Sequence, residues 1–320
     1  MIDVDSVVTV GARQVRFEIA PKPPFRLDLT VWALRRRSHN VLDRWDGTTY
    51  RRAASPESHE VELAVRQIAP VESPRLEVVV TGPSSAAAVV RPAADAVDRL
   101  LGASVDLDAW YEIAAGNEAT AGLADRFRGM KPPRFSSTYE ALMTAIFCQQ
   151  ITLDFGITIV NAWIERFGGR LQGPEQAVWL LPAPSALARL RASELRPLRI
   201  SRQKATAAIE VSCRVTRCEL DLEMLESRPD GDVIDTLTGL PGVGRWTADH
   251  VLLRGLGRLH TFPSNDAGAR NSLSKLLGAE RPMRYDEVAR AVTRWQPYAG
   301  MLYFHLLVAG LERSGRLAIG

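Results

Sequence analysis

Several features that would direct this chain of 320 residues toward other functions are scarce in it. Cysteine occurs three times, at Cys148, Cys213 and Cys218, and this spacing fits neither a four-cysteine zinc site nor an iron–sulfur cluster. An odd number of cysteines cannot form a complete set of disulfides, so we expect reduced thiols in the cytosol. The five histidines show no metal-ligand spacing either. The composition therefore argues against a disulfide framework and against a metal site built from side chains.

A long hydrophobic run is also missing. The longest apolar stretch, residues 301–311, contains His305 and is shorter than the roughly 20 residues that span a bilayer. We therefore expect a buried helix there. The chain opens with Asp3 and Asp5, whereas a secretory signal has a basic region at this point. These observations predict a soluble protein without a secretory signal.

Charge of one sign is not in strong excess. Lysine and arginine total 40 and acidic residues 37, a net charge of +3, so any contact with nucleic acid must come from local placement of charge. The arginine clusters at 35–37 and 51–52 are typical of solvated faces, with phosphate contact as the alternative. Apolar residues make up 46% of the chain, which is typical of a packed globular protein, and the length allows two or three domains.

The first hundred residues predict a small antiparallel sheet. The expected strands alternate in polarity or are rich in β-branched residues, and they comprise residues 7–10, 15–19, 27–31, 61–68 and 76–80. Asp46-Gly47, between 41–42 and 48–50, is a strong signal for a hairpin turn. The alanine-rich segment 83–101 has helical spacing and is expected to cover the sheet.

After about residue 105 the strand-like alternation disappears and amphipathic helical windows follow one another. The expected helices span about 155–167, 185–195, 201–217, 232–238, 247–256, 267–277, 285–294 and 300–312. Ser137-x-x-Glu140 is a capping box that opens a further helix. We therefore predict a mainly α fold, with an N-terminal α+β domain over residues 1–104 and an all-α region over residues 105–320.

The most informative stretch is Leu-Thr-Gly-Leu-Pro-Gly-Val-Gly-Arg-Trp-Thr-Ala at residues 237–248. Apolar residues at helical spacing lie on both sides of it, which predicts a helix–hairpin–helix over about 232–256. Gly242 and Gly244 permit a tight corner and a close approach to another backbone. The next helix begins with unpaired N–H groups that suit a phosphate, and Arg245 adds charge. The alternative is a plain corner in which glycine only closes the turn.

The part of this string from Leu240 to Ala248 resembles the helix-hairpin-helix (HhH-GPD) DNA glycosylase superfamily. Its Arg-Trp-Thr-Ala portion is most similar to the bacterial 3-methyladenine DNA glycosylase II (AlkA-type) branch. The resemblance covers most of residues 105–312, and AlkA-type enzymes also carry a small N-terminal α+β domain. It implies a base-excision-repair enzyme that flips damaged, alkylated purines out of double-stranded DNA and hydrolyses their N-glycosidic bond. It further implies a monomer that needs no cofactor and lies in the bacterial cytoplasm with the nucleoid.

The resemblance also implies a catalytic aspartate shortly downstream, and Asp266 lies there, just before a helical run. An aspartate in this position is usually a helix N-cap. Both roles are compatible, because a helix N-terminus stabilises an ionised carboxylate. Cleavage of the glycosidic bond develops oxocarbenium-like positive charge on the sugar, which a carboxylate stabilises.

Trp246 determines the expected subtype. Members of the family that also cut the strand carry a lysine at this position, which forms a Schiff base with the sugar. Tryptophan stands here instead, and no lysine near the motif replaces it. We therefore predict a monofunctional glycosylase that leaves an abasic site and has no lyase activity.

The resemblance implies several DNA contacts. The segment from Ala145 to Thr152 resembles the one that fills the gap left by a flipped base, with Gln150 as the wedge and Gln149 as its neighbour. The alternative is a pair of polar residues that close an amphipathic helix. The remaining predicted DNA contacts belong to the hairpin and the next turn: Gly242, Val243, Gly244, Arg245 and Thr247. The backbone carbonyls of Thr238, Leu240 and Val243 are candidates to hold a monovalent cation, sodium or potassium.

The predicted base pocket comprises Trp246, His250, Tyr303 and Leu307. His250 and Leu307 stand where the alkylpurine pattern has aromatic residues that stack on the base, and His250 is either a pocket residue or a core histidine. Tyr303 restores an aromatic wall. Residues 297–300 are also similar to the 8-oxoguanine branch, so a glycosylase for oxidised bases is one alternative. The other is a DNA-binding protein without catalysis, in which Asp266 is only a cap.

Overall fold

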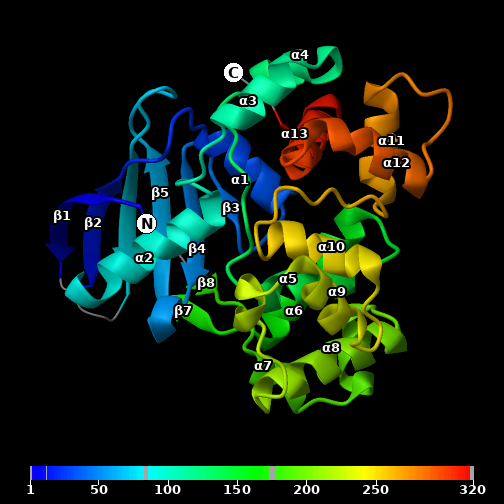
Figure 1. Ribbon diagram of the computed structural model, residues 1–320. Helices are drawn as coiled ribbons and strands as arrows, with labels where there is room; N and C mark the ends of the chain where they lie inside the picture. Colours follow the sequence, from blue (N-terminus) through cyan, green and yellow to red (C-terminus); the bar gives the residue numbers. More distant parts are fainter. Residues whose placement is uncertain (1, 12, 83–85, 173–176, 318–320) are drawn as a thin grey trace.

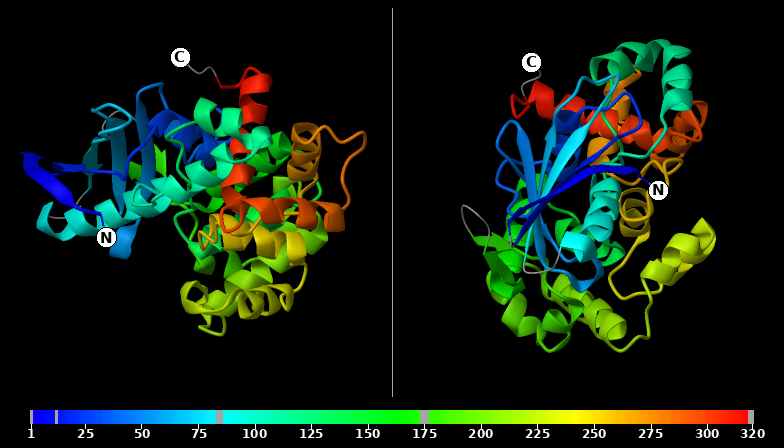
Figure 2. Two further views of the ribbon diagram at one scale, coloured as in Figure 1. Left: turned by 45° about the horizontal axis from the view of Figure 1, so that its top comes forward. Right: turned by 90° about the vertical axis from the view of Figure 1, so that its left-hand side faces the viewer.

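A six-stranded antiparallel sheet and a larger group of helices make up the molecule (Figure 1). The computed structural model describes residues 2–11, 13–82, 86–172 and 177–317. The strands lie in the order β1-β2-β6-β5-β4-β3, with bounds β1 (Val4–Gly11), β2 (Gln14–Ile19), β3 (Arg44–Trp45), β4 (Thr49–Ala54), β5 (Val61–Gln67) and β6 (Leu76–Thr81). The left view of Figure 2 shows the sheet at one end of the molecule and the orange helices near residue 275 at the other.

One face of the sheet is buried, because its strands alternate in polarity. In β2 the buried side chains are Val15, Phe17 and Ile19, and their neighbours are partly or fully exposed. Helix α2 (Ala86–Leu101) lies across this face (Figure 1). The predicted helix over the sheet is thus confirmed for residues 86–101, whereas residues 83–85 lie outside the described part of the chain.

The prediction of a strand at residues 27–31 is wrong, because this segment belongs to helix α1 (Leu27–Arg35). Val31 and Leu34 pack in the core under the sheet, while Leu29 and Ala33 pack in the core of the helical part. A helix buried on both sides is apolar nearly all round, so alternation in a short window imitates a strand. The sheet and the helical part thus share α1. The division of the chain into two domains at residue 104 remains a prediction.

The hairpin turn at Asp46-Gly47 is confirmed, although it joins β3 and β4 rather than residues 41–42 and 48–50. The Asp46 carboxylate accepts hydrogen bonds from the N–H groups of Thr48 and Thr49, at 2.9 and 2.7 Å. Gly47 has a φ of +106°, a conformation that glycine adopts without a steric penalty.

The rest of the chain is mainly helical, as predicted. Its helices are α3 (Asp108–Ala115), α4 (Glu118–Arg126), α5 (Thr138–Cys148), α6 (Leu153–Phe167), α7 (Pro184–Ala188), α8 (Arg202–Thr216), α9 (Asp230–Thr238), α10 (Arg245–Arg254), α11 (Ala267–Leu276), α12 (Tyr285–Ala291) and α13 (Ala299–Arg313). The helices expected at 185–195 and 285–294 are shorter. Helix α12 continues directly as a 3-10 turn at Val292–Trp295, whereas a break at residues 189–191 separates α7 from a 3-10 helix at Ala192–Leu198. The antiparallel pair of β7 (Arg170–Gln172) and β8 (Ala177–Trp179) was not predicted, because strands of three residues carry little periodicity. None of the helices in the described ranges is long and apolar enough to cross a membrane.

The capping box at Ser137 forms in part. The Ser137 hydroxyl accepts the N–H of Glu140 at 3.1 Å, as predicted. The Glu140 carboxylate turns instead to Arg52 of β4, at 2.6 Å, and Arg52 also pairs with Asp43 at 2.6 Å. This buried ion-pair network joins the sheet to α5.

The prediction that the arginine clusters form solvated faces is wrong for most of these residues. Arg35, Arg36 and Arg52 are at most 4% exposed. Arg37 forms an ion pair with Asp154 at 2.8 Å. The arginines are buried because they lie where the sheet meets the helical part, and carbonyl groups and carboxylates from several elements face them there.

Candidate active site

The predicted helix–hairpin–helix is present, formed by α9, the turn at 239–244 and α10. The turn is closed by the N–H of Val243, which donates to the carbonyl of Leu240 at 3.1 Å. Gly242 has a φ of +76°, and a Cβ built on it would lie 3.0 Å from the Cβ of Ala207. Gly244 caps α10 in an extended conformation without a side-chain hydrogen bond. The first N–H groups of α10 therefore lie at the exposed end of the corner, the arrangement that suits an anion.

The predicted DNA contacts divide into exposed and buried residues. Gly242, Gly244 and Arg245 are exposed, and Arg245 forms an ion pair with Asp249 of the next turn at 2.7 Å. The side chains of Val243 and Thr247 are buried, at 5% and 1% exposure. A contact of Val243 or Thr247 with DNA would therefore have to use the backbone. Arg245 can reach a phosphate by giving up its ion pair with Asp249.

The Gln149–Gln150 segment lies against the hairpin. The Gln149 amide donates to the Gly242 carbonyl at 3.0 Å and to the Thr247 hydroxyl at 2.8 Å. Lys204 of α8 donates to the carbonyl of Gln149 at 2.5 Å, at the end of α5. Gln150 is exposed and has a φ of +55°. The structure thus places Gln149 as a connection between α5 and the hairpin and leaves Gln150 projecting beside it.

Asp266 lies beside the start of α10 and caps α11. One carboxylate oxygen accepts the N–H of Ala269 at 2.8 Å, so the predicted capping role is present. The other oxygen accepts the indole N–H of Trp246 at 3.0 Å. The side chain is half-buried rather than enclosed. One residue therefore combines a structural cap with a carboxylate held in a fixed orientation next to the hairpin.

Aromatic side chains from α10 and α13 form a continuous wall beside Asp266. The rings of Trp246 and His250 stack with centroids 5.2 Å apart, and Tyr303 meets His250 edge-on at 6.4 Å. Leu307 follows Tyr303 by one turn and is half-buried. Burial, followed by the charges of Arg254 and Arg36, lowers the pKa of His250 well below its ordinary value. His250 is thus a buried, neutral member of the wall, in contact with predicted pocket residues on both sides.

Two arginines beside this wall were missed by the sequence interpretation. Arg254, the last residue of α10, is fully buried and donates to the carbonyls of Ala33 and Leu34 in α1, at 3.0 and 3.1 Å. Burial lowers the pKa of Arg254 to about 10. Arg36 is 4% exposed and lies near the same neighbours. The available signal was that Trp246, His250 and Arg254 follow each other at intervals of four residues, on one face of a helix.

The candidate cation site fits in part. Thr238 ends α9, so its carbonyl belongs to the negative end of the helix dipole. The Leu240 carbonyl accepts the N–H of Val243 but retains a second lone pair. Such carbonyls suit a weakly held monovalent cation. Within the described residues, no group of three or more histidine, cysteine or acidic side chains is placed to hold a metal ion.

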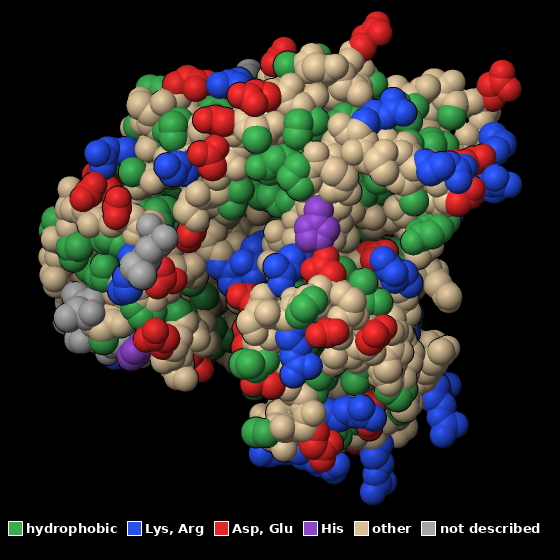
Figure 3. All heavy atoms as spheres, viewed as in Figure 1, with side chains coloured by type: hydrophobic (Ala, Val, Ile, Leu, Met, Phe, Trp, Pro, Cys, Tyr) green, Lys and Arg blue, Asp and Glu red, His purple; other side chains and the backbone are tan. Residues whose placement is uncertain are grey.

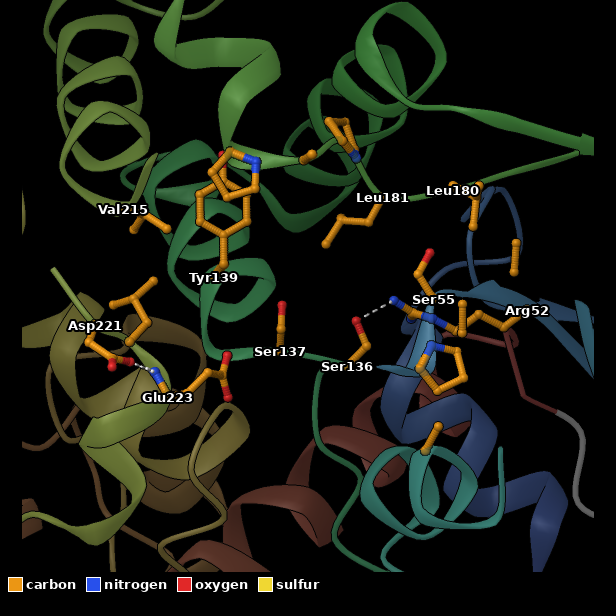
Figure 4. Close-up of a pocket in the computed structure, with 18 of the residues that line it drawn as sticks. Arg52, Ser55, Ser136, Ser137, Tyr139, Leu180, Leu181, Val215, Asp221 and Glu223 are labelled. Atoms are coloured by element: carbon orange, nitrogen blue, oxygen red, sulfur yellow. Dashed lines mark hydrogen bonds between the residues drawn. The ribbon is translucent and has the colours of Figure 1, made fainter. Parts of the chain in front are cut away.

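A cavity of about 610 Å³ lies elsewhere, between the end of β4, the start of α5 and the end of α8. Figure 3 shows the hollow on this side of the molecule, and Figure 4 shows Tyr139, Leu181 and Ser55 on its walls. The Tyr139 hydroxyl is already bonded to Ser212 at 2.8 Å. None of the predicted site residues lines this cavity, so its size does not make it the candidate active site.

The fold and the site together define a helix-hairpin-helix protein with a carboxylate beside its hairpin. Residues 143–297 match the family model described as HhH-GPD superfamily base excision DNA repair protein. This match covers 155 of the 320 residues, and it agrees with the resemblance that the sequence motifs indicate.

Two Bacillus subtilis relatives are similar in sequence. The putative DNA-3-methyladenine glycosylase YfjP is 31% identical over 53% of this chain and 58% of its own length. A DNA-3-methyladenine glycosylase is 27% identical over 63% of this chain and 66% of its own length. This chain thus spans less than two thirds of the length of either relative.

The solved structure of a 3-methyladenine DNA-glycosylase from Archaeoglobus fulgidus covers nearly the whole chain. It superposes with a TM-score of 0.81 over 94% of this chain and 99% of its own, at 23% identity. The shared fold includes the N-terminal sheet as well as the helical part, and the predicted fold class is confirmed.

Proposed function

We propose that the protein is a monofunctional DNA glycosylase of base excision repair, which everts a damaged, alkylated purine from double-stranded DNA and hydrolyses its N-glycosidic bond. The observation that carries the proposal is the Asp266 carboxylate, fixed by Trp246 beside the hairpin. The names of the relatives, DNA-3-methyladenine glycosylases, support the same reaction and this class of substrate.

In the proposed reaction the exposed N–H groups at the start of α10 bind a backbone phosphate, and Gln150 enters the duplex to replace the everted base. The bond between C1′ of the sugar and the purine nitrogen breaks, and its electron pair leaves with the base. Asp266 stabilises the positive charge that develops on the sugar and orients the water that adds to C1′. An alkylated purine that carries positive charge departs as a neutral molecule, which makes it a good leaving group.

The absence of lyase activity is part of the proposal. A lyase needs an amine that forms a Schiff base with the sugar. Among the described residues, the hydrogen-bond partners found for the Asp266 carboxylate are the Trp246 indole and the Ala269 backbone, and neither is such an amine. Lys204, on α8, is bound to the carbonyls of Phe147 and Gln149.

We further propose that the protein acts as a monomer in the cytoplasm with the nucleoid and holds a monovalent cation at the hairpin.

The proposal is tested by base release from duplexes that contain 3-methyladenine or 7-methylguanine. We expect release by the wild type and a loss on the order of 100-fold or more in Asp266→Asn, with binding to an abasic-site duplex retained. Asp235→Asn, an exposed acid on α9, is the matched control and should keep full activity. Binding without base release in the wild type would favour a non-catalytic protein. A covalent adduct trapped with borohydride would overturn the monofunctional assignment.

A further inference from the structure

Residues 189–204 carry a concentration of positive charge that the proposed reaction does not use. They hold six basic side chains and one acid, whereas the whole chain has a net charge of +3. The rest of the chain therefore has a net charge of −2. The segment begins just after α7, continues through the 3-10 helix Ala192–Leu198 and ends in the first turn of α8. Figure 3 shows Lys and Arg side chains at the lower end of the molecule, where α7 and α8 lie in Figure 1.

Five exposed arginines of this segment form what we call the arginine surface. They are Arg189, Arg191, Arg196, Arg199 and Arg202. The apolar residues between them, Leu195 and Leu198, are buried in the core of the helical part. Arg196 and Arg199 are three residues apart, which is one turn of a 3-10 helix, so they lie on the same side of it. Packing of the leucines thus holds the arginines at the surface.

The fold does not neutralise these charges. Within the described ranges of the chain, none of the five arginines forms an ion pair with a carboxylate. Glu194 is the one acid of the segment, and its carboxylate accepts the backbone N–H of Arg191 at 2.8 Å. Exposed arginines elsewhere, such as Arg126 and Arg281, pair with glutamates. A cluster of unpaired charges of one sign attracts a partner of the opposite sign.

Helix α8 connects the arginine surface to the hairpin. Ala207 of this helix lies against the corner, where its Cβ is 3.0 Å from the position of a Cβ built on Gly242. Lys204 donates to the carbonyl of Gln149 at 2.5 Å. Arg202 lies two residues before Lys204, in the first turn of α8. One end of the arginine surface is therefore next to the candidate active site.

The other end lies well away from it. The Cys213 thiol donates to the carbonyl of Ala188 at 3.4 Å, so Arg189 lies near the end of α8. Cys213 follows Lys204 by nine residues, which is about 14 Å along the helix. One strand of duplex DNA has a phosphate about every 3.4 Å along the axis. The arginine surface therefore spans the length of about four nucleotides of one strand.

We propose that the arginine surface binds the backbone of the duplex that flanks the lesion, without reading its sequence, and holds the protein on undamaged DNA. This inference rests on the proposed function, because DNA is taken as the partner. The hairpin and Gln150 act at the everted nucleotide, whereas the arginine surface contacts the phosphates beyond it. A guanidinium group suits this role because it stays charged and binds two phosphate oxygens at once.

The test is the salt dependence of binding to an undamaged duplex, measured by fluorescence anisotropy. Each phosphate contact contributes about 1 to the slope of log K against log salt, because binding releases counterions. The triple variant Arg189→Gln, Arg191→Gln, Arg196→Gln should therefore lower the slope by about 3. Replacement of the same three residues by lysine keeps the charge and should retain the slope.

The matched control removes three exposed arginines from the sheet, through Arg16→Gln, Arg66→Gln and Arg75→Gln. This control changes the net charge equally and should leave the slope unchanged. An unchanged slope in the glutamine variant of the arginine surface, shown to be folded by circular dichroism, would overturn the inference. An equal fall in slope in the control would do the same, because net charge alone would then explain the effect.

Duplex length separates contact with flanking DNA from contact at the lesion. The difference between the wild type and the glutamine variant should disappear as the duplex is shortened toward the lesion, and a constant difference would overturn the inference. Failure of the wild type to release any base would refute the proposed function. The salt slopes would still decide the role of the arginine surface, since they are measured on undamaged DNA.

Discussion

Replacement of Gln149 by alanine tests whether the hairpin positions Gln150, the proposed wedge. The Gln149 amide makes two hydrogen bonds, to the Gly242 carbonyl at 3.0 Å and to the Thr247 hydroxyl at 2.8 Å. They connect the end of α5 to both sides of the hairpin corner. The next residue, Gln150, has a φ of +55°, which costs a non-glycine residue roughly 1 kcal/mol. The hydrogen bonds of Gln149 therefore hold the residue next to Gln150, the proposed wedge, whose backbone is strained.

The expected magnitude follows from these contacts. Each hydrogen bond contributes about 1 kcal/mol net, so Gln149→Ala removes about 2 kcal/mol that favours the projecting conformation of Gln150. If this conformation fills the gap in the duplex, the complex with the everted base loses the same amount of stabilisation, about 2 kcal/mol. The equilibrium constant for eversion then falls about 30-fold. The free energy of unfolding should fall by no more than this amount.

The assay is stopped-flow fluorescence of a 2-aminopurine base placed next to the lesion, together with single-turnover base release. We expect Gln149→Ala to reduce both the fluorescence amplitude and the rate, with little change in the affinity for undamaged duplex. Gln203→Ala, an exposed glutamine on α8, is the matched control and should behave as the wild type. Normal eversion and release in Gln149→Ala would refute the reasoning, because the wedge would then be positioned without the hairpin.

Two further predictions concern the hairpin and the core. Gly242→Ala should raise the dissociation constant for DNA about tenfold, because a side chain at a φ of +76° and 3.0 Å from Ala207 would displace the corner at a cost of about 1–2 kcal/mol. Fluorescence-anisotropy titrations measure this constant, with Gly231→Ala, which has open space around it, as the control. An unchanged affinity in Gly242→Ala would contradict this role of the corner. Burial lowers the pKa of His305 to about 4, below the ordinary value of about 6.5, so its contribution to stability is complete above pH 6.5 and is lost as the pH falls toward 4. Urea unfolding should show a loss of about 2 kcal/mol from this residue between pH 7 and pH 5, which His305→Gln should lack, and an equal loss in both proteins would count against it.

Local features of the site could be predicted from the sequence because they depend on residues close in the chain. Gly242 and Gly244 between two apolar helical windows predict the corner, and the structure contains it. Asp266 before a helical run predicts an N-cap, and its carboxylate accepts the N–H of Ala269. Each of these depends on hydrogen bonds that span three to five residues, and local sequence largely determines those.

Other features could not be predicted, because they depend on distant parts of the chain. The apolar residues of segment 27–31 suit a strand as well as a helix, and only the two cores on either side of α1 favour the helix. Arg35–Arg37 read as a solvated run until their partners are known. The notable case is Arg254, which donates to carbonyls 220 and 221 positions away.

The sequence by itself determined the hairpin, the capping aspartate that follows it and the tryptophan in the first turn of α10, because residue type and short-range spacing fix all three. Only the tertiary structure decided that Asp266 bonds to Trp246, that Gln149 joins the end of α5 to the hairpin and that two arginines meet beside the aromatic wall. The burial of a charge depends on what surrounds it in space, and the groups that surround Arg254 come from α1, α13 and the segment before α5.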